Sequence, residues 1–509
     1  MPNPKLFSVT RRRLLTGSAQ AAVMIGAMQY VPALAQDTSR AVIAQAYDAQ
    51  PRNLLAFRGG NFPWIKNVFE TLTYTDPETF EPQPELATDW TLSDDGMTLT
   101  LNLRDDVTFH TGRKMTAADV KYSLETAALP ETASQIGFIA RSFMAIDTPS
   151  DTQVVITFSQ PTSNVWDLFE ETPIIDKETY AEREDGSKVI GTGPYKFVSW
   201  TPGAELQLSR YDDYRDKDAA KIHDLDYAII ADPTATIAAV RSGRAQIGYG
   251  MTPRDVIEFD RNPMYTIVST AGTIYPFGVN VEEGPFDQKS VRQAVGYAID
   301  RQRIIDQVFD GAGTPTDLFW SPSSPGYTEE LANRYSYDPD KASKMLDDAG
   351  AKGAKVTIII PAIPANRSIF EIVQNNLREV GLEPEARVLD VAEYDQRQVA
   401  GDLGQSFILI HGQVGFQTAT LLSSLPSLRK GNPSHFWNDE YERLRNAVSA
   451  ASTADDQAKA VTALSEYMLD EAFTLALLQA PSPSVVSADL EGVSFSRRGY
   501  ILFKNATYR

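Results

Sequence analysis

The chain of 509 residues contains no cysteine and only four histidines. The absence of cysteine excludes disulfide bonds, a thiol nucleophile, thiolate metal sites and an N-terminal cysteine for lipid attachment. No two of the histidines have metal-ligand spacing, and the sequence motifs of serine hydrolases, P-loop proteins and zinc proteases are missing. We therefore expect no catalytic residues, no metal site and no cofactor.

Positive charge is also scarce. The chain has 47 basic against 67 acidic residues, a net charge of −20. Nucleic acid and anionic membrane repel so acidic a protein, and we expect neither as a partner. The acidic residues could include the paired carboxylates of a glycosidase or another hydrolase, but the sequence cannot place two of them across a cleft. An enzyme of that kind stays open as an alternative.

Long apolar runs are missing too. The stretch Leu14 to Leu34 is interrupted by polar residues and glycines, so it is too polar for a membrane anchor, which needs ~20 mostly apolar residues. It follows the basic pair Arg11 and Arg12 and ends in an A-x-A site at Ala35, which predicts a removable signal peptide over residues 1–35. The arginines resemble a twin-arginine signal, for proteins exported folded; an ordinary Sec signal is the alternative. With no cysteine to lipidate, we expect a freely diffusing protein of a bacterial periplasm.

The region after the signal is predicted to be rich in β-strands. Residues 98–103 alternate between apolar and polar side chains, as do residues 154–158, and both patterns are typical of strands. Between them, Thr116-x-x-Asp119 is typical of a capping box at the start of a helix. Residues 191–194 superficially resemble a phosphate-binding loop, but Pro194 favours a turn into a strand.

The second half alternates helices and buried strands. Ser290, the pair Asp338-Pro339, and Ser368 are predicted to start helices. Residues 356–360 and 407–410 are continuous apolar runs, as expected for strands covered on both faces. This order indicates an α/β fold, and the chain is long enough for at least two lobes.

Ligands in such sheets bind beyond the carboxyl ends of the strands. The loops 361–368 and 411–420 are therefore candidate binding loops. Arg367 lies in the first of them, just before a predicted helix start, where an anion is favoured and a carboxylate can be bound in bidentate fashion.

Several segments, in order along nearly the whole chain after the signal, resemble the extracellular solute-binding proteins of ABC importers in the peptide/nickel class, family 5. They are Pro84–Trp90, Ser93–Gly96, Leu103–His110, Thr116–Val120, Gly191–Tyr195, Tyr211–Tyr214, Val291–Arg301 and Leu377–Leu382.

The resemblance implies the two-lobed periplasmic-binding-protein fold, with α/β lobes that close over a ligand about hinge strands and an extra β-rich subdomain in the first lobe. The expected first lobe comprises residues 36–75, 189–280 and 482–509, the inserted subdomain residues 76–188, and the second lobe residues 281–481. The chain is expected to cross between lobes near Asn280 and Pro481.

The resemblance also bears on the ligand. Dipeptide binders of the family bind the peptide carboxylate with an arginine at the position of Arg367, and the α-ammonium with an aspartate in a Trp-Gly-x-Asp-like loop. The corresponding loop here, residues 411–417, has no acidic residue. Because a buried ammonium without a counter-charge is costly, we expect a small carboxylate-bearing solute, such as an opine-like sugar–amino acid conjugate. His411, Gln413 and Gln417 would contact its hydroxyl or amide groups.

Further lining residues are expected by rough correspondence with family pockets: Phe57, Arg58, Phe62, Tyr275, Phe416 and Trp437. The expected partners are the small-molecule ligand and the transmembrane permease of an ABC importer with its ATPase, and the chain is expected to be a monomer. Two alternatives remain within the family, a peptide or oligopeptide receptor with another amine contact and a carrier of a chelated metal. A periplasmic hydrolase is the alternative outside it.

Overall fold

The computed structural model describes residues 38–509 apart from 57, 78, 80, 187, 413 and 414. All contacts given below lie within one unit, Ser39–Arg509. The predicted signal peptide, residues 1–35, lies outside the described residues.

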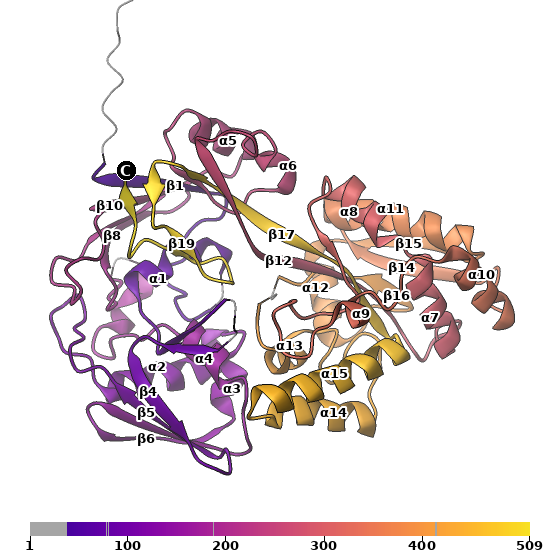
Figure 1. The fold of residues 1–509 in the computed structure, drawn as a ribbon, viewed down its shortest axis with the longest axis horizontal. Coiled ribbons are helices and arrows are strands. Elements are labelled where there is room, and N and C mark those ends of the chain that lie inside the picture. Colours follow the sequence, from indigo (N-terminus) through magenta and orange to yellow (C-terminus); the bar gives the residue numbers. More distant parts are fainter. Residues whose placement is uncertain (1–37, 57, 78, 80, 187, 413–414) are drawn as a thin grey trace, which may run out of the picture. The chain divides into compact units, whose positions relative to one another are not determined.

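An eleven-stranded sheet organises this unit (Figure 1). In spatial order its strands are β15 (Glu383–Leu389), β14 (Lys355–Pro361), β16 (Ser406–Ile408), β12 (Tyr265–Val279), β17 (Thr474–Ser487), β11 (Ile247–Gly248), β1 (Arg40–Gln45), β10 (Asp224–Ile229), β9 (Glu205–Arg210) and β8 (Tyr195–Thr201), and β13 (Thr314–Pro315) pairs with β17.

The long antiparallel strands β12 and β17 connect the two lobes, and Figure 1 shows them side by side. Their register shifts between Thr270 and Thr273, opposite the segment 480–482. We refer to the part of the sheet on the β1 side of this shift as the first lobe and to the part on the β14 side as the second. Strand β12 stays paired with β17 as far as Gly278, and the crossings near Asn280 and Pro481 stay predictions.

The first lobe is built around β1, which is parallel to β10 and β11. Its hydrophobic core joins Ile43 to Trp64, Tyr195 and Ile501, residues far apart in the sequence. Its short elements are η1 (Gly59–Asn61), α1 (Ile65–Val68), α5 (Pro233–Arg241), α6 (Pro253–Val256) and the strand pairs β18 (Leu490–Glu491) with β21 (Thr507–Tyr508) and β19 (Ser494–Phe495) with β20 (Ile501–Leu502).

The loop 191–194 has the structural role expected from Pro194. A Cβ on Gly191 would lie 2.0 Å from the carbonyl oxygen of Val68, and one on Gly193 would lie 2.5 Å from that of Asn67. Both positions need glycine because two backbones approach closely there, and β8 begins directly afterwards at Tyr195.

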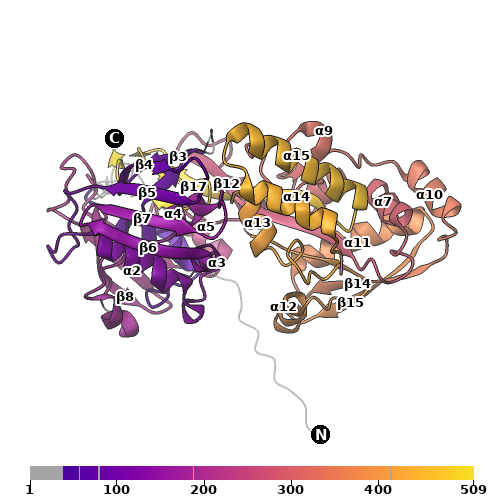
Figure 2. The same ribbon diagram turned by 90° about the horizontal axis from the view of Figure 1, so that it is seen from below.

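The inserted region forms a four-stranded antiparallel sheet whose neighbouring strands are visible in Figure 2. Its elements are β2 (Thr73–Thr75), β3 (Pro82–Pro84), β4 (Ala87–Leu92), β5 (Thr98–Leu103), α2 (Ala117–Ala128), η2 (Pro130–Thr132), α3 (Gly137–Arg141), β6 (Phe143–Ser150), β7 (Gln153–Phe158), α4 (Val165–Glu171) and η3 (Tyr180–Asp185). The strands predicted at 98–103 and 154–158 and the capping box of Thr116 with Asp119 are confirmed.

The second lobe packs helices on both faces of a parallel β15–β14–β16 group. Its helices are α7 (Lys289–Ala298), α8 (Arg301–Val308), α9 (Glu329–Ala332), α10 (Pro339–Asp348), α11 (Pro364–Glu379), α12 (Val391–Ala400), α13 (Thr418–Ser424), α14 (Asp439–Ala450) and α15 (Ala454–Glu471). Ile358 of β14 packs into one hydrophobic cluster and Ile359 into another, which confirms that this strand is covered on both faces.

Two predicted helix starts in this lobe are wrong. Helix α7 begins at Lys289 after Gln288, and α11 begins at Pro364 after Ile363, so Ser290 and Ser368 lie inside helices. In α11 the proline at the first position fixes the start one turn before the serine. The Asp338 cap of α10 is confirmed, since its carboxylate accepts a hydrogen bond from the Lys341 backbone N–H. Within residues 38–509, as far as they are described, no helix has the length and apolarity needed to cross a membrane.

Candidate ligand-binding site

A cleft with about 360 Å³ of free volume lies between residues of the two lobes and the inserted subdomain. Its lining residues are Gly59, Phe62 and Arg498 of the first lobe, Gln135 of the subdomain, and Gln398, Ile410, His411, Gly412, Leu425 and Pro426 of the second lobe. This volume is in the range of small-molecule sites. Among these lining residues one side chain is formally cationic and none is acidic.

His411 presents a neutral imidazole to this cleft. Its backbone forms an isolated β-bridge with Ile274 of β12, which holds the start of the 411–420 loop against the sheet. The side chain is buried, and its Nε2 lies 2.9 Å from Ser427 Oγ. Burial lowers the pKa of His411 to about 4. The imidazole is therefore a neutral hydrogen-bonding group at physiological pH rather than a cation.

Arg498 is the cationic lining residue, and its charge is already balanced. Its Nε lies 3.4 Å from Glu171 Oε1, and the other oxygen of Glu171 accepts a hydrogen bond of 2.5 Å from the Tyr500 hydroxyl. The guanidinium also lies over the ring of Phe416, 3.5 Å from its centroid. Arg498 thus connects a carboxylate of the inserted subdomain to an aromatic side chain of the second lobe.

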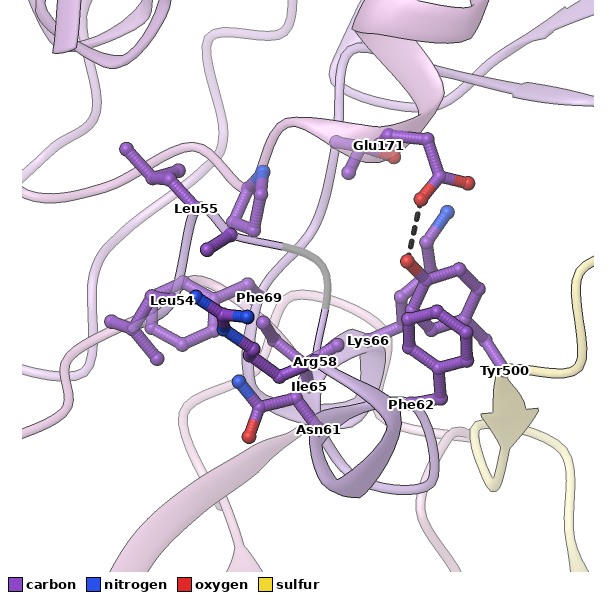
Figure 3. Close-up of a pocket in the computed structure, with 13 residues that line it drawn as sticks. Leu54, Leu55, Arg58, Asn61, Phe62, Ile65, Lys66, Phe69, Glu171 and Tyr500 are labelled. Carbon is purple, nitrogen blue, oxygen red and sulfur yellow. Dashed lines mark hydrogen bonds between the residues drawn. The ribbon is translucent and has the colours of Figure 1, made fainter. Parts of the chain in front are cut away.

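Figure 3 shows a smaller pocket, which is lined by residues of the first lobe and of the inserted subdomain. It has about 20 Å³ of free volume, which is room for about one water molecule. Arg58, Lys66, Phe69 and Glu171 are among its lining residues, and the Glu171–Tyr500 hydrogen bond is drawn there. Phe62 lines both this pocket and the cleft, and its ring lies 4.7 Å from that of Tyr500.

Arg367 lies in the first turn of α11, three residues after the helix start and six after the end of β14. Its side chain is exposed, and among the described residues no ion pair or side-chain hydrogen bond is formed with it. The neighbouring Asn366 is buried, and its amide donates to the carbonyl of Ile408, 3.3 Å away. This contact fixes the first turn of α11 against the end of β16. A ligand contact of Arg367 stays a prediction.

Phe416 and Gln417 lie in the candidate loop but serve packing contacts. Phe416 is completely buried, and the backbone N–H of Gln417 donates to Asp167 Oδ2 at 2.9 Å. The Gln417 side chain lines a separate small pocket with Ser163 and Val448. Neither residue is among those that line the cleft.

Tyr275 and Trp437 are not among the residues that line the cleft. Tyr275 packs in the second-lobe core against Phe309, with ring centroids 5.2 Å apart, and burial raises its pKa to about 12. The indole of Trp437 donates to Glu442 at 3.1 Å, beside α14. The lining role expected for these two residues is therefore not supported by their positions. Phe57, Gln413, Arg11, Arg12 and Ala35 lie outside the described residues.

Three polar residues of the cleft could not be selected from the sequence. Gln135, Gln398 and Arg498 lie in no recognisable motif, and Glu171, the partner of Arg498 outside the cleft lining, is separated from it by more than 300 residues. The adjacent arginines Arg497 and Arg498 near the C-terminus were the one available signal. Within the described part of the chain, no group of three or more His, Cys, Asp or Glu side chains could hold a metal ion.

Comparison with known proteins gives a consistent result. The family model "Bacterial extracellular solute-binding proteins, family 5 Middle" matches residues 81–430. The di/tripeptide-binding protein 1 of Pseudomonas aeruginosa (strain UCBPP-PA14) is 26% identical, with 77% of this chain and 79% of that protein covered.

Solved structures share the fold. HbpA2 from Haemophilus parasuis matches with a TM-score of 0.82 at 20% identity, covering 92% of this chain and 100% of that one. AgaA from A. tumefaciens R10 matches with a TM-score of 0.75 at 23% identity, covering 92% and 99%. The chain thus belongs to family 5 of the bacterial extracellular solute-binding proteins, the non-enzymatic receptors of ABC importers.

Proposed function

We propose that this receptor captures a small carboxylate-bearing organic solute in the cleft and delivers it, in the periplasm, to the permease of an ABC importer. The observation that carries the proposal is the charge of the cleft. Among its lining residues Arg498 is the single formal charge, and Glu171 already balances it. The remaining polar lining groups are two glutamine amides and the neutral imidazole of His411.

The two amides and the neutral imidazole suit the end of such a solute that bears hydroxyl or amide groups, and they are unfavourable to the α-ammonium of a free peptide. The α-ammonium of a peptide would need an acidic partner when buried, and no acidic residue lies among the described cleft residues. Amides and a neutral imidazole hydrogen-bond hydroxyl and amide groups instead. The exposed guanidinium of Arg367, in the first turn of α11, is available to a carboxylate.

A peptide ligand is the second candidate. The P. aeruginosa relative is named as a di/tripeptide-binding protein, and a dipeptide-binding protein with the same fold was solved with Met-Leu. AgaA, in turn, was solved with agropinic acid. The fold therefore accommodates both kinds of ligand, and the cleft residues of this chain must decide between them. Export through the twin-arginine route also belongs to this proposal and rests on Arg11 and Arg12.

Calorimetry on the purified protein separates the two candidates. We expect opine-like sugar–amino acid conjugates to bind and free dipeptides to bind poorly. In the proposed complex the bound solute covers the pair between its carboxylate and Arg367. Loss of one partner of a buried charged pair costs ~2–5 kcal/mol, so Arg367→Ala should weaken binding of the conjugate by about 30-fold or more. Arg378→Ala, which removes an exposed arginine from the far end of the same helix, is the control. Tight dipeptide binding that survives Arg367→Ala would refute the proposal.

A further inference from the structure

Asp167 is a fully buried carboxylate of α4, in the inserted subdomain, and donors of both lobes surround it. From the first lobe, Arg497 Nη2 donates to Oδ1 at 2.9 Å. From the second lobe, the Gln417 backbone N–H and the Thr420 hydroxyl donate to Oδ2 at 2.9 and 2.5 Å. One side chain therefore holds groups that belong to different lobes.

The partners of Asp167 are fixed in turn. Arg497 also binds Glu170 at 3.1 Å and Thr75 at 3.4 Å, so its guanidinium is anchored to the α4 and β2 side of the molecule. The next residue, Arg498, lies over Phe416, the neighbour of Gln417 in the second lobe. Two adjacent arginines thus act on the same loop, Arg497 through Asp167 and Arg498 directly on Phe416.

This loop is the one that begins at the cleft. His411 and Gly412 line the cleft, and Gln417 and Thr420 lie where the loop enters α13. Hydrogen bonds to a charged acceptor are stronger than neutral ones, and a buried carboxylate deprived of donors is costly. Any movement of the second lobe away from the subdomain removes both Oδ2 donors at once, so the contact stabilises one relative position of the lobes.

We propose that Asp167 is a positioning residue that holds residues 416–420 of the second lobe against the Arg497–Arg498 corner of the first lobe and thereby stabilises the closed form of the receptor. The inference rests on the proposed function only in that the two lobes of the receptor move relative to one another. Asp167 does not line the cleft, so it acts through the loop and not by contact with the solute.

The same chain offers a matched control. Arg254 of α6 in the first lobe and Asp310 in the second lobe, after α8, form an ion pair between the lobes, with a separation of 3.1 Å. The Arg254 side chain is 75% exposed, whereas those of Arg497 and Asp167 are 6% and 0% exposed. If any polar contact between the lobes stabilised closure, the exposed Arg254–Asp310 pair would matter as much as the buried contact of Asp167 with Gln417 and Thr420.

The test is the distance between spin labels on the two lobes, measured without solute by pulsed electron resonance. Because the sequence has no cysteine, Met144→Cys in β6 and Val399→Cys in α12, both at exposed positions, give two unique labels. We expect a short-distance population in the labelled parent. Asp167→Asn should reduce the ratio of short to long distances by about tenfold, as expected when hydrogen bonds to a charged acceptor are lost. An asparagine can offer its oxygen to Arg497 or to the loop donors, but not to both.

Thr420→Val removes only the second-lobe hydroxyl, keeps the side-chain shape, and leaves the Arg497 pair in place. It should shift the distances in the same direction by a smaller amount, and it tests the proposal if Asp167→Asn fails to fold. Asp310→Asn should leave the distances unchanged. The proposal is overturned if the parent has no short-distance population, if Asp167→Asn lowers the melting temperature without moving the distances, or if Asp310→Asn moves them equally. Because no solute is used, these outcomes are independent of the calorimetric test of the proposed function.

Discussion

Two carboxylates of the described chain bind groups across the lobes of this receptor, Asp167 through the hydrogen bonds from Gln417 and Thr420 and Asp310 through its ion pair with Arg254, and the two contacts differ in burial. Asp167 and Arg497 are buried, and each has several further partners. Arg254 and Asp310 lie at the surface, with no further side-chain partner for the guanidinium among the described residues. Solvent screens an exposed pair, while a buried pair loses its hydration and depends on its partners. The comparison leads us to expect that burial determines which of the two contacts fixes the lobes.

The largest expected effect is the loss of the buried carboxylate. Asp167→Ala leaves the guanidinium of Arg497 with one carboxylate fewer, and breaking a buried pair in this way costs ~3–5 kcal/mol. Denaturant unfolding followed by circular dichroism should show a decrease of that size in the free energy of unfolding. An unchanged midpoint would mean that water replaces the carboxylate without cost, and the contrast between the two pairs would disappear.

The next effect concerns pH and extends the comparison to a buried side chain that is uncharged, the imidazole of His411. Burial lowers the pKa of His411 to about 4, against an ordinary value of about 6.5. In the unfolded chain the imidazole takes up a proton as the pH falls through about 6.5, while in the folded chain it stays neutral until about pH 4. Folding stability is therefore present above pH 6.5 and is lost as the pH falls toward 4, by ~3 kcal/mol for this group.

His411→Gln should remove this loss, and unfolding curves of parent and variant between pH 4.5 and 7.5 measure it as a difference. The difference is needed because other groups titrate in the same range. His110 has the same lowered pKa, about 4, through burial, whereas burial raises the pKa of Glu85 to about 7 and gives a slope of opposite sign. Parallel pH profiles for parent and variant would contradict the neutral histidine in the cleft.

A smaller effect is expected for a substitution that keeps the positive charge of Arg498 and removes its planar group. Arg498→Lys retains a cation near Glu171 but removes the planar group that lies on Phe416. A desolvated cation–π contact contributes ~2 kcal/mol, and lysine recovers only part of it. We expect a decrease of about 1–2 kcal/mol in the free energy of unfolding. If Arg498→Lys were as damaging as Arg498→Ala, the contact would depend on hydrogen-bond geometry and not on charge.

The smallest effect belongs to the exposed pair. Arg254→Ala should leave the unfolding midpoint unchanged within error, at low salt and at high salt, because solvent already screens this guanidinium. A clear decrease that vanishes in high salt would assign the surface pair a role in joining the lobes.

The sequence predicts the fold well where the determinants are local. The Thr116 capping box and the buried strand at 356–360 are recognisable because each depends on side chains a few residues apart. The predicted caps at Ser290 and Ser368 are wrong because the same serine spacing also occurs inside a helix, and only Pro364 marked the true start of α11.

The site is less predictable because its contacts are distant in sequence. His411 and Phe62 could be proposed from loops and from family resemblance, and both line the cleft. The Arg498–Glu171 and Arg497–Asp167 pairs could not be predicted. Each joins residues more than 300 positions apart, and neither partner lies in a recognisable local motif. Tyr275 was proposed by the same resemblance, yet it packs in the core, because an aromatic residue in a strand fits a core as readily as a pocket.

The first lobe is assembled from both ends of the described chain, and this has a consequence for biosynthesis. Ile501 and Phe503 lie in the same core as Ala41 and Ile43. A ribosome-bound chain therefore cannot complete this core until residue 503 has emerged, although domains made of contiguous sequence fold during synthesis. Until Arg497 has also emerged, Asp167 and Glu170 have no guanidinium to bind. The first lobe of the nascent chain therefore stays incompletely folded while the second lobe is translated. During this time chaperones can bind the exposed core residues of the first lobe.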